Sequence, residues 1–284
     1  MRGLGYRPDL PDARDHDALK VIRTAMVPAS IARSPYTKVL DQGGLGSCTC
    51  NAAGQVIRAQ EIKQLVSTAV ANGVYFDTAL ADAQASTEFL SRLFAYYLAR
   101  AVDHTTKDDA GTYIRTVFAV LNKFGFPPES AWTYSDGPTK FAQMPASAVF
   151  RRAADQRAGL PENVDLVNYS RIYQTGYDRV DAVKAALADG HLFAFGTSVS
   201  EHFCSDMSAN GGRPIDPPVG LSIAGGHAMT IGGYDAAGAD VLNSWSEEYG
   251  ESGWCRFSWD YVAWPETGDL WIAQRAPLIS QEAA

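Results

Sequence analysis

Residues 41–52 read Asp-Gln-Gly-Gly-Leu-Gly-Ser-Cys-Thr-Cys-Asn-Ala and join a glycine-rich turn to a helix-forming run. The turn delivers Cys48 to the start of that helix. Unpaired backbone N–H groups at a helix N-terminus carry partial positive charge, which favours a thiolate and raises its nucleophilicity at neutral pH. A lone cysteine is more often a small buried hydrophobic residue. Cys48 by itself therefore leaves both interpretations open.

Two later stretches supply the groups that a nucleophilic cysteine needs. Residues 225–234 read Gly-Gly-His-Ala-Met-Thr-Ile-Gly-Gly-Tyr and put His227 at the edge of an apolar, strand-like run. Asn243 follows after a short turn, in the sequence Val-Leu-Asn-Ser-Trp. A cysteine nucleophile needs a histidine as base and a third group that orients the imidazole. The order Cys48, His227, Asn243 therefore favours a nucleophilic site.

These stretches together resemble three motifs of the papain-like (C1) cysteine peptidases. Residues 42–48 match the family's glutamine-to-cysteine motif, residues 226–228 its histidine motif, and residues 243–254 its Asn-Ser-Trp motif with the following glycines. The match covers about residues 36–262. The Leu-Gly-Ser-Cys-Thr sequence and the aromatic run at residues 94–100 are similar to the bacterial branch of the family.

The resemblance implies an α+β, two-lobed fold with the active-site cleft between a helical lobe and an antiparallel β-barrel lobe. We expect an extended N-terminal arm over residues 1–35, where prolines interrupt regular pairing. The peptidase domain would then span residues 36–284. Its helical lobe would cover about 36–160 and its β-barrel lobe about 161–284.

Apolar periodicity predicts the main elements. Small and apolar residues recur at three- and four-residue spacing from Cys48 to about Val70, which predicts an amphipathic helix. Further helices are predicted over residues 86–100, 112–124 and 177–189, and strands over residues 164–173 and 192–199. Short strands with glycine turns after His227 suggest a twisted antiparallel barrel.

The resemblance implies a cysteine peptidase that acts through a thioester acyl-enzyme. Cys48 and His227 would form a thiolate–imidazolium pair, which lowers the pKa of the thiol. Gln42 and the Cys48 backbone N–H would donate to the oxyanion, and losing one such donor typically costs ~2.7–4 kcal/mol. Asn243 would orient His227, and Trp245 would cover their hydrogen bond from water.

Four residues are candidate substrate-binding residues, namely Gly111, Thr112, Ala228 and Trp245. The family has a Gly-Gly pair that lets a substrate backbone approach closely, and Gly111-Thr112 stands there in this chain. Glycine permits that approach, whereas Thr112 narrows the cleft or is an ordinary helix cap. Ala228 matches a family position that lines the main side-chain pocket. It predicts a medium to large apolar residue at the second position before the cleaved bond.

The amino-acid composition limits the kinds of partner that the protein can bind. Of 284 residues, 46% are hydrophobic and 20% are charged, which is typical of a globular protein, and the net charge of −8 argues against binding nucleic acid or an anionic membrane. No apolar stretch reaches the ~20 residues of a spanning helix, and residues 1–9 lack the apolar core of a signal peptide. We therefore expect a cytoplasmic protein, or one exported without a classical signal, that acts on peptides or proteins.

The cysteines do not indicate a metal site, and they do not establish a disulfide. Cys48 and Cys50 are too unspecific a pair for zinc, which needs four closed ligands, and we predict no metal and no cofactor. Four cysteines in the chain fit a reducing compartment. A disulfide between Cys204 and Cys255 remains open.

Two alternatives come from other functional classes. The first is a catalytically silent papain-fold module that binds peptides, and the second is a thiol acyltransferase or deamidase on the same scaffold. All four chemical positions are intact, which favours a working peptidase. The N-terminal arm either packs across the body as a strap or lies across the cleft and limits substrate access.

Overall fold

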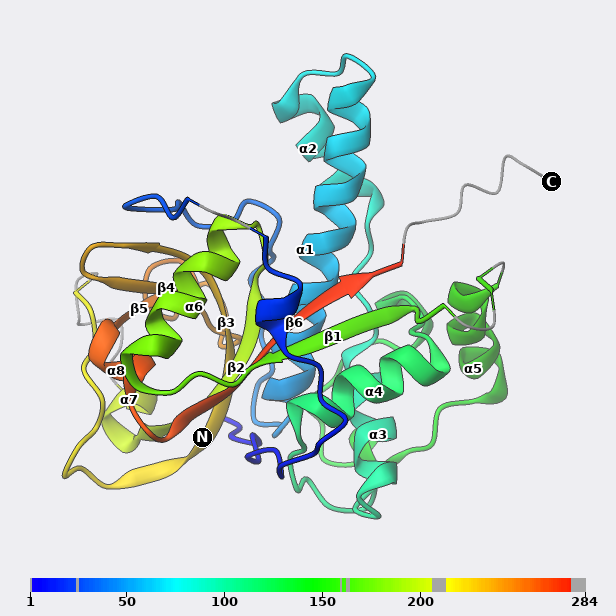
Figure 1. The fold of residues 1–284 in the computed structure, drawn as a ribbon. Coiled ribbons are helices and arrows are strands. Elements are labelled where there is room, and N and C mark those ends of the chain that lie inside the picture. Colours follow the sequence, from blue (N-terminus) through cyan, green and yellow to red (C-terminus); the bar gives the residue numbers. More distant parts are fainter. Residues whose placement is uncertain (1, 24–25, 159, 162–163, 206–212, 277–284) are drawn as a thin grey trace.

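The structure, a computed structural model, describes residues 2–23, 26–158, 160–161, 164–205 and 213–276 (Figure 1). Its helices are α1 (Cys48–Ala71), α2 (Phe76–Ser86), α3 (Arg92–Val102), α4 (Ile114–Phe124), α5 (Ser147–Ala154), α6 (Gly176–Ala188), α7 (Glu201–Ser205) and α8 (Trp259–Ala263). Its strands are β1 (Val167–Ile172), β2 (Phe193–Ser200), β3 (Ile223–Asp235), β4 (Gly238–Leu242), β5 (Trp254–Ser258) and β6 (Thr267–Arg275).

The strands form one antiparallel sheet in the order β1-β6-β2-β3-β4-β5. Within the described part of the chain β1 and β5 are its two edges, so the sheet is open. The α+β class is confirmed, and the predicted closed β-barrel is wrong. Strand periodicity predicts which segments are extended. It does not predict whether the two edge strands of the sheet pair with each other and close a barrel, and the described strands β1 and β5 do not pair.

Helices cover both faces of the sheet (Figure 1). Helices α1 and α4 pack on β1, β2, β3 and β6, while α6 and α8 pack on the opposite side. The core under α1, α3 and α4 also contains sheet side chains such as Ala194, Ala228 and Trp271. Because this core joins the helices to the sheet, the lobe division at about residue 160 stays a prediction.

Helix α1 lies at the centre of the molecule. Its first half is buried on nearly every side, because Ala53, Val56 and Ile57 all face neighbours. Polar side chains of this half are buried as well, so its burial does not follow one apolar face. Its second half extends past the sheet and packs on α2 through Ile62 and Val66, forming the projection at the top of Figure 1.

The helix predicted over residues 86–100 is two elements. Ser86 ends α2, and α3 begins at Arg92 after a short extended segment in which Leu90 pairs with Pro128. Ser91 caps α3, because its Oγ accepts from the backbone N–H of Phe94 at 3.3 Å. The single helix predicted over residues 86–100 is therefore wrong, because the segment before Ser91 is extended.

The N-terminal arm crosses the body between its helical and sheet parts. Its described residues include a 3-10 turn at Ala18–Lys20. Backbone bridges join it to α4, β1 and β3 regions at Tyr6–Thr112, Asp17–Arg171 and Ile31–Tyr234. These contacts spread over widely separated segments, so the arm packs as a strap along its length.

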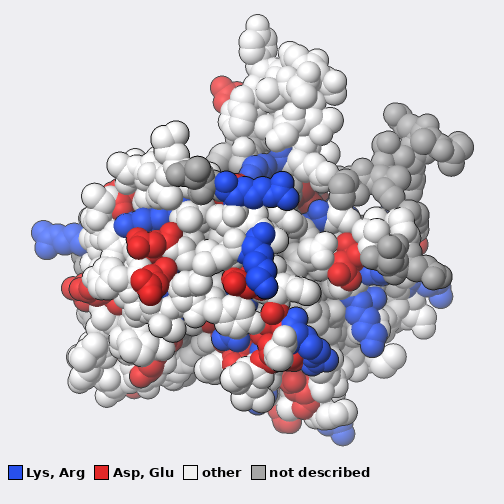
Figure 2. All heavy atoms as spheres, viewed as in Figure 1, with Lys and Arg blue, Asp and Glu red and all other residues white. Residues whose placement is uncertain are grey.

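Ion pairs also fasten the arm. Asp15 lies 2.9 Å from the Arg115 side chain of α4 and 3.6 Å from the Arg171 side chain of β1. Acidic and basic side chains are accordingly interspersed on the face shown in Figure 2. None of the described helices is both long enough and apolar enough to cross a membrane.

Arg92 ties the turn before Cys48 to two helices. Its guanidinium forms two hydrogen bonds to the Glu129 carboxylate, at 3.0 and 2.6 Å, and donates to the Asp41 carbonyl and to Asn51 Oδ1. It also lies over the Tyr134 ring, 3.8 Å from the centroid. A planar guanidinium suits such a site because it donates in a fixed fork.

Replacing Arg92 by leucine should lower the free energy of unfolding by about 3 kcal/mol, because the Glu129 carboxylate then keeps its enclosed position without a partner. Urea unfolding of the purified variant measures this. The matched control is Arg14→Ala, whose side chain is 89% exposed; it should cost less than about 1 kcal/mol. Equal losses in the two variants would contradict this role of Arg92.

Candidate active site

The candidate nucleophile is the first residue of α1. Cys48 follows Ser47, whose side chain makes no capping hydrogen bond, so the first N–H groups of the helix keep their partial positive charge. The Cys48 side chain is fully buried. Backbone N–H groups of Ala228, Gly5 and Thr49 face its sulfur. The glycine turn before the helix therefore aims the thiol at β3 and at the arm.

The candidate base lies on β3. His227 Nε2 donates to Asn243 Oδ1 at 2.8 Å, and Asn243 directly follows β4. Trp245 stacks on the imidazole, with ring centroids 4.6 Å apart and planes 27° apart. With Nε2 protonated, Nδ1 of a neutral imidazole carries the lone pair that can accept a thiol proton. Among the described residues Nδ1 has no hydrogen-bond partner.

Gln42 is held rigidly beside the cysteine. Its Nε2 donates to the Leu45 carbonyl at 2.8 Å and to the Gly3 carbonyl at 3.0 Å. Ser244 Oγ donates to its Oε1 at 2.6 Å, which fixes the orientation of the amide. The side-chain amide of Gln42 thus donates one hydrogen bond within the turn and one to a carbonyl oxygen of the arm.

The arm pairs with both sides of this site. Thr112 N–H donates to the Gly5 carbonyl at 2.8 Å, and Arg7 N–H donates to the Thr112 carbonyl at 3.1 Å. Tyr6 N–H donates to the carbonyl of Gly226, the residue before His227, at 3.1 Å. The arm therefore occupies an extended, hydrogen-bonded position directly over Cys48.

Glycines allow this close approach. Gly3 and Gly5 lie so near the turn that a Cβ on either would overlap the carbonyl of Leu45 or of Gly46. Gly111 has φ +67°, and a Cβ there would overlap the Gly5 carbonyl. Glycine alone adopts both the conformation and the approach without strain.

The covered site holds both candidate groups in their neutral forms. Burial raises the pKa of the Cys48 thiol to about 11, although the surrounding N–H groups oppose this shift. Burial also lowers the pKa of His227 to about 4, against the hydrogen bond to Asn243. The expected lowering of the thiol pKa is therefore wrong for this arm-covered state, because desolvation outweighs the helix N-terminus.

The other predicted substrate-binding residues lie at different depths. Gly111 and Thr112 border the arm, as described above. Ala228 is fully buried on β3, opposite Gly196 of β2. Trp245 is fully buried behind His227, so it contacts the imidazole and presents no surface to a substrate.

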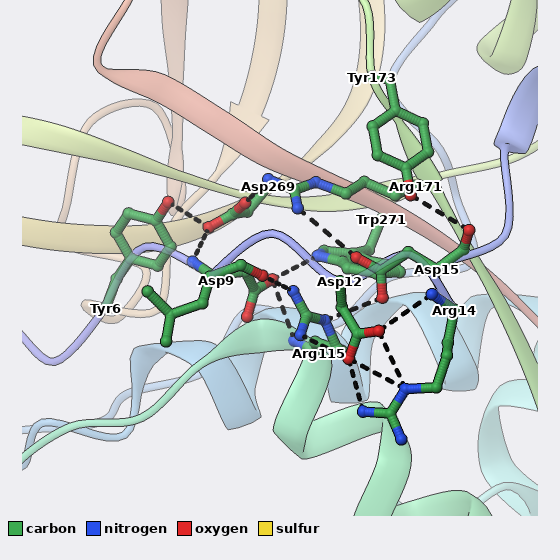
Figure 3. A network of polar contacts seen from close by, with 11 residues as sticks. Tyr6, Asp9, Asp12, Arg14, Asp15, Arg115, Arg171, Tyr173, Asp269 and Trp271 are labelled. Atoms are coloured by element: carbon green, nitrogen blue, oxygen red, sulfur yellow. Dashed lines mark hydrogen bonds and ion pairs between the residues drawn. The ribbon is translucent and has the colours of Figure 1, made fainter.

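Sequence patterns missed a polar network that anchors the arm (Figure 3). Tyr6 OH and Asp9 N–H both donate to Asp269 Oδ2, at 2.7 and 2.5 Å, and Trp271 Nε1 donates to Asp9 Oδ2 at 2.8 Å. Burial, aided by the nearby Asp269, raises the pKa of the Asp9 carboxyl. The arm does show aspartates at residues 9, 12, 15 and 17, but this pattern says nothing about the partner Asp269.

The remaining cysteines carry no visible chemistry in the described residues. Cys50 and Cys255 are free and buried, and burial raises the pKa of both thiols. The side chain of Cys204 lies outside the described part, but Cys255, its partner in the disulfide that the sequence left open, is free. Within the described ranges no three His, Cys, Asp or Glu side chains are arranged to hold a metal ion.

Known proteins resemble this chain in sequence and in fold. No family model matches the sequence. An uncharacterised peptidase C1-like protein of Acanthamoeba polyphaga mimivirus is 29% identical over 303 residues, which cover 98% of this chain and 89% of the viral protein. Xylellain, a cysteine protease from Xylella fastidiosa, superposes with a TM-score of 0.76 and 28% identity over 97% of both chains.

A second solved structure supports the fold alone. Digestive procathepsin L2 from the larval midgut of Tenebrio molitor superposes with a TM-score of 0.59 over 96% of this chain and 74% of its own, at 16% identity. Because the similarity to xylellain spans both chains, and Cys48 lies against the strand whose His227 is hydrogen-bonded to Asn243, the chain is identified as a cysteine peptidase with a papain-like fold.

Proposed function

We propose that this peptidase hydrolyses peptide bonds through Cys48 and that its N-terminal arm keeps it latent. The observation that carries the proposal is the hydrogen bond from Gln42 Nε2 to the Gly3 carbonyl, 3.0 Å long, beside a fully buried Cys48. The amide that the family resemblance assigns to the oxyanion is thus already occupied. A substrate carbonyl has to displace the arm before it can reach the same donor.

The steps follow from the residues around the thiol. Once the arm leaves, water reaches Cys48 and His227, the desolvation penalty falls, and a proton passes from sulfur to Nδ1. The thiolate attacks the peptide carbonyl, and Gln42 Nε2–H with the Cys48 N–H stabilises the oxyanion. The imidazolium then protonates the leaving amine. Water hydrolyses the thioester, with His227 as base.

Chain direction supports a blocking role rather than a substrate role. The arm passes Gln42 at Gly3 and reaches Thr112 only at Gly5 and Arg7, so it runs from the oxyanion donors towards Thr112. If the acyl half of a substrate pairs with Thr112, as the resemblance implies, a substrate runs the opposite way. The arm then offers Cys48 no carbonyl in a cleavable orientation.

Opening the arm should activate the enzyme. In Gly5→Ala the added Cβ overlaps the Gly46 carbonyl, and overpacking of this kind costs about 1–3 kcal/mol. Turnover of a small fluorogenic peptide under reducing conditions should therefore rise about 5- to 150-fold, since 1.4 kcal/mol is a factor of ten.

Two variants control this test. Leu10→Ala changes an arm side chain that is 70% exposed and should leave turnover as it is. Gly5→Ala combined with Cys48→Ala should abolish turnover, because the nucleophile is gone. Equal turnover by the native chain and by Gly5→Ala would contradict arm latency, and turnover that survives loss of Cys48 would contradict the mechanism.

The raised thiol pKa predicts a distinct pH dependence of alkylation. In the native chain the rate at Cys48 should rise about tenfold per pH unit through neutral pH, because the covered thiol is protonated below its pKa of about 11. In Gly5→Ala the rate should level off at lower pH, because the exposed pair ionises more readily.

Iodoacetamide labelling, with the modified peptide identified by mass spectrometry, measures both profiles. Labelling of both proteins after unfolding in urea serves as the reference, since the buried thiols are then exposed in each. Superimposable Cys48 profiles would show that the arm does not control ionisation of the thiol.

A further inference from the structure

Tyr6 fills a side-chain pocket next to the catalytic pair. The pocket floor is formed by Gly196 of β2 and Gly226 of β3, and a Cβ on Gly196 would overlap the Tyr6 ring. The three atoms nearest to such a Cβ all belong to Tyr6. The missing side chain at Gly196 therefore creates room for an aromatic ring.

Asp269 lies at the hydroxyl end of the Tyr6 side chain and accepts its hydrogen bond (Figure 3). It lies where β6 carries one extra residue opposite β2, between the pairs Ala194–Trp271 and Gly196–Gly268. Its φ of +50° is in the left-handed region, and its side chain is almost fully buried. Bulges re-aim side chains next to functional sites, and aspartate tolerates this conformation better than most residues.

The two carboxylate oxygens of Asp269 have different partners. Oδ1 pairs with the Arg171 guanidinium from β1. Oδ2 accepts only uncharged donors of the arm, the Tyr6 hydroxyl and the Asp9 N–H. When the arm leaves, Oδ2 loses both donors and faces the empty pocket as an acceptor, while Arg171 still balances the charge.

We propose that Asp269 is a specificity-determining residue and that the open pocket selects a tyrosine side chain of the peptide substrate. The proposal rests on the proposed function, because the pocket receives a substrate only after the arm has left. A substrate tyrosine would place its ring over Gly196 and donate its hydroxyl to Asp269 Oδ2, as Tyr6 does. This refines the apolar preference expected from Ala228.

Competing side chains fit less well. Phenylalanine fills the same volume but leaves a buried acceptor without a donor, which costs more than the missing contact alone. Arginine and lysine gain little, because Asp269 is already paired with Arg171, and a second cation is repelled by it. The predicted order at this position is tyrosine, then phenylalanine, then arginine.

The test compares three fluorogenic peptides that differ only at the second residue before the cleaved bond, carrying tyrosine, phenylalanine or arginine. The ratio of two kcat/KM values on one enzyme is independent of the fraction of molecules with an open arm, so the native chain and Gly5→Ala should give the same ratios. We expect tyrosine to exceed phenylalanine on the order of 10-fold, the effect of one hydrogen bond to a charged group.

Asp269→Asn is the matched variant. Asparagine tolerates the left-handed backbone, so the fold is kept, but the amide turns its N–H₂ group towards the pocket when its oxygen accepts from Arg171. A tyrosine hydroxyl can only accept from this neutral N–H₂ group, so the charge-assisted hydrogen bond is lost and the tyrosine to phenylalanine ratio should fall severalfold. Asn243 and Cys48 are untouched, so turnover of the phenylalanine peptide should persist.

Each result has a definite meaning. A native ratio near one, or an arginine peptide cleaved fastest, would overturn the tyrosine pocket while leaving the peptidase intact. A high ratio that survives Asp269→Asn would overturn the role of Asp269. Failure of every peptide on Gly5→Ala would contradict the proposed function itself and the pocket with it.

Discussion

The contact between the first turn of α1 and strand β3 positions everything in this molecule that concerns chemistry. It brings the Cys48 sulfur to the Ala228 N–H, one residue after His227, and Thr230 Oγ1 also donates to the Ala52 carbonyl at 3.3 Å. Cys48 and His227 thus come from elements that are far apart in the sequence and pack against each other in one buried contact. Arg92 and Gln42 hold the turn before Cys48 in place, through hydrogen bonds to the carbonyls of Asp41 and Leu45.

The arm lies over the same contact between α1 and β3, and the proposed latency would therefore couple regulation to substrate recognition. It approaches closely only because three positions lack a Cβ, and it inserts Tyr6 where a substrate side chain would lie. Covering the thiol also changes its chemistry, since burial keeps Cys48 and His227 neutral. In the proposed latent state, a single docking event therefore blocks the oxyanion donors, fills the pocket and suppresses the nucleophile.

The local parts of this account could be predicted from the sequence. The helix from Cys48, the order of the candidate catalytic residues and the glycine before α4 are encoded in short motifs and periodicity. The open sheet, the true cap at Ser91 and the role of Asp269 could not, because each depends on which distant segments meet. Tyr6 and Asp269 are 263 residues apart, and no local pattern connects them.

The most direct test of the central claim is a crystal structure of the chain after inactivation by an epoxide that reacts with papain-like enzymes. The account predicts a covalent bond to Cys48 Sγ, with the inhibitor hydrogen-bonded to Thr112 and Gly226 and the first nine residues displaced from the cleft. An arm that still pairs with Thr112 beside an alkylated Cys48, or a label on another residue, would contradict it.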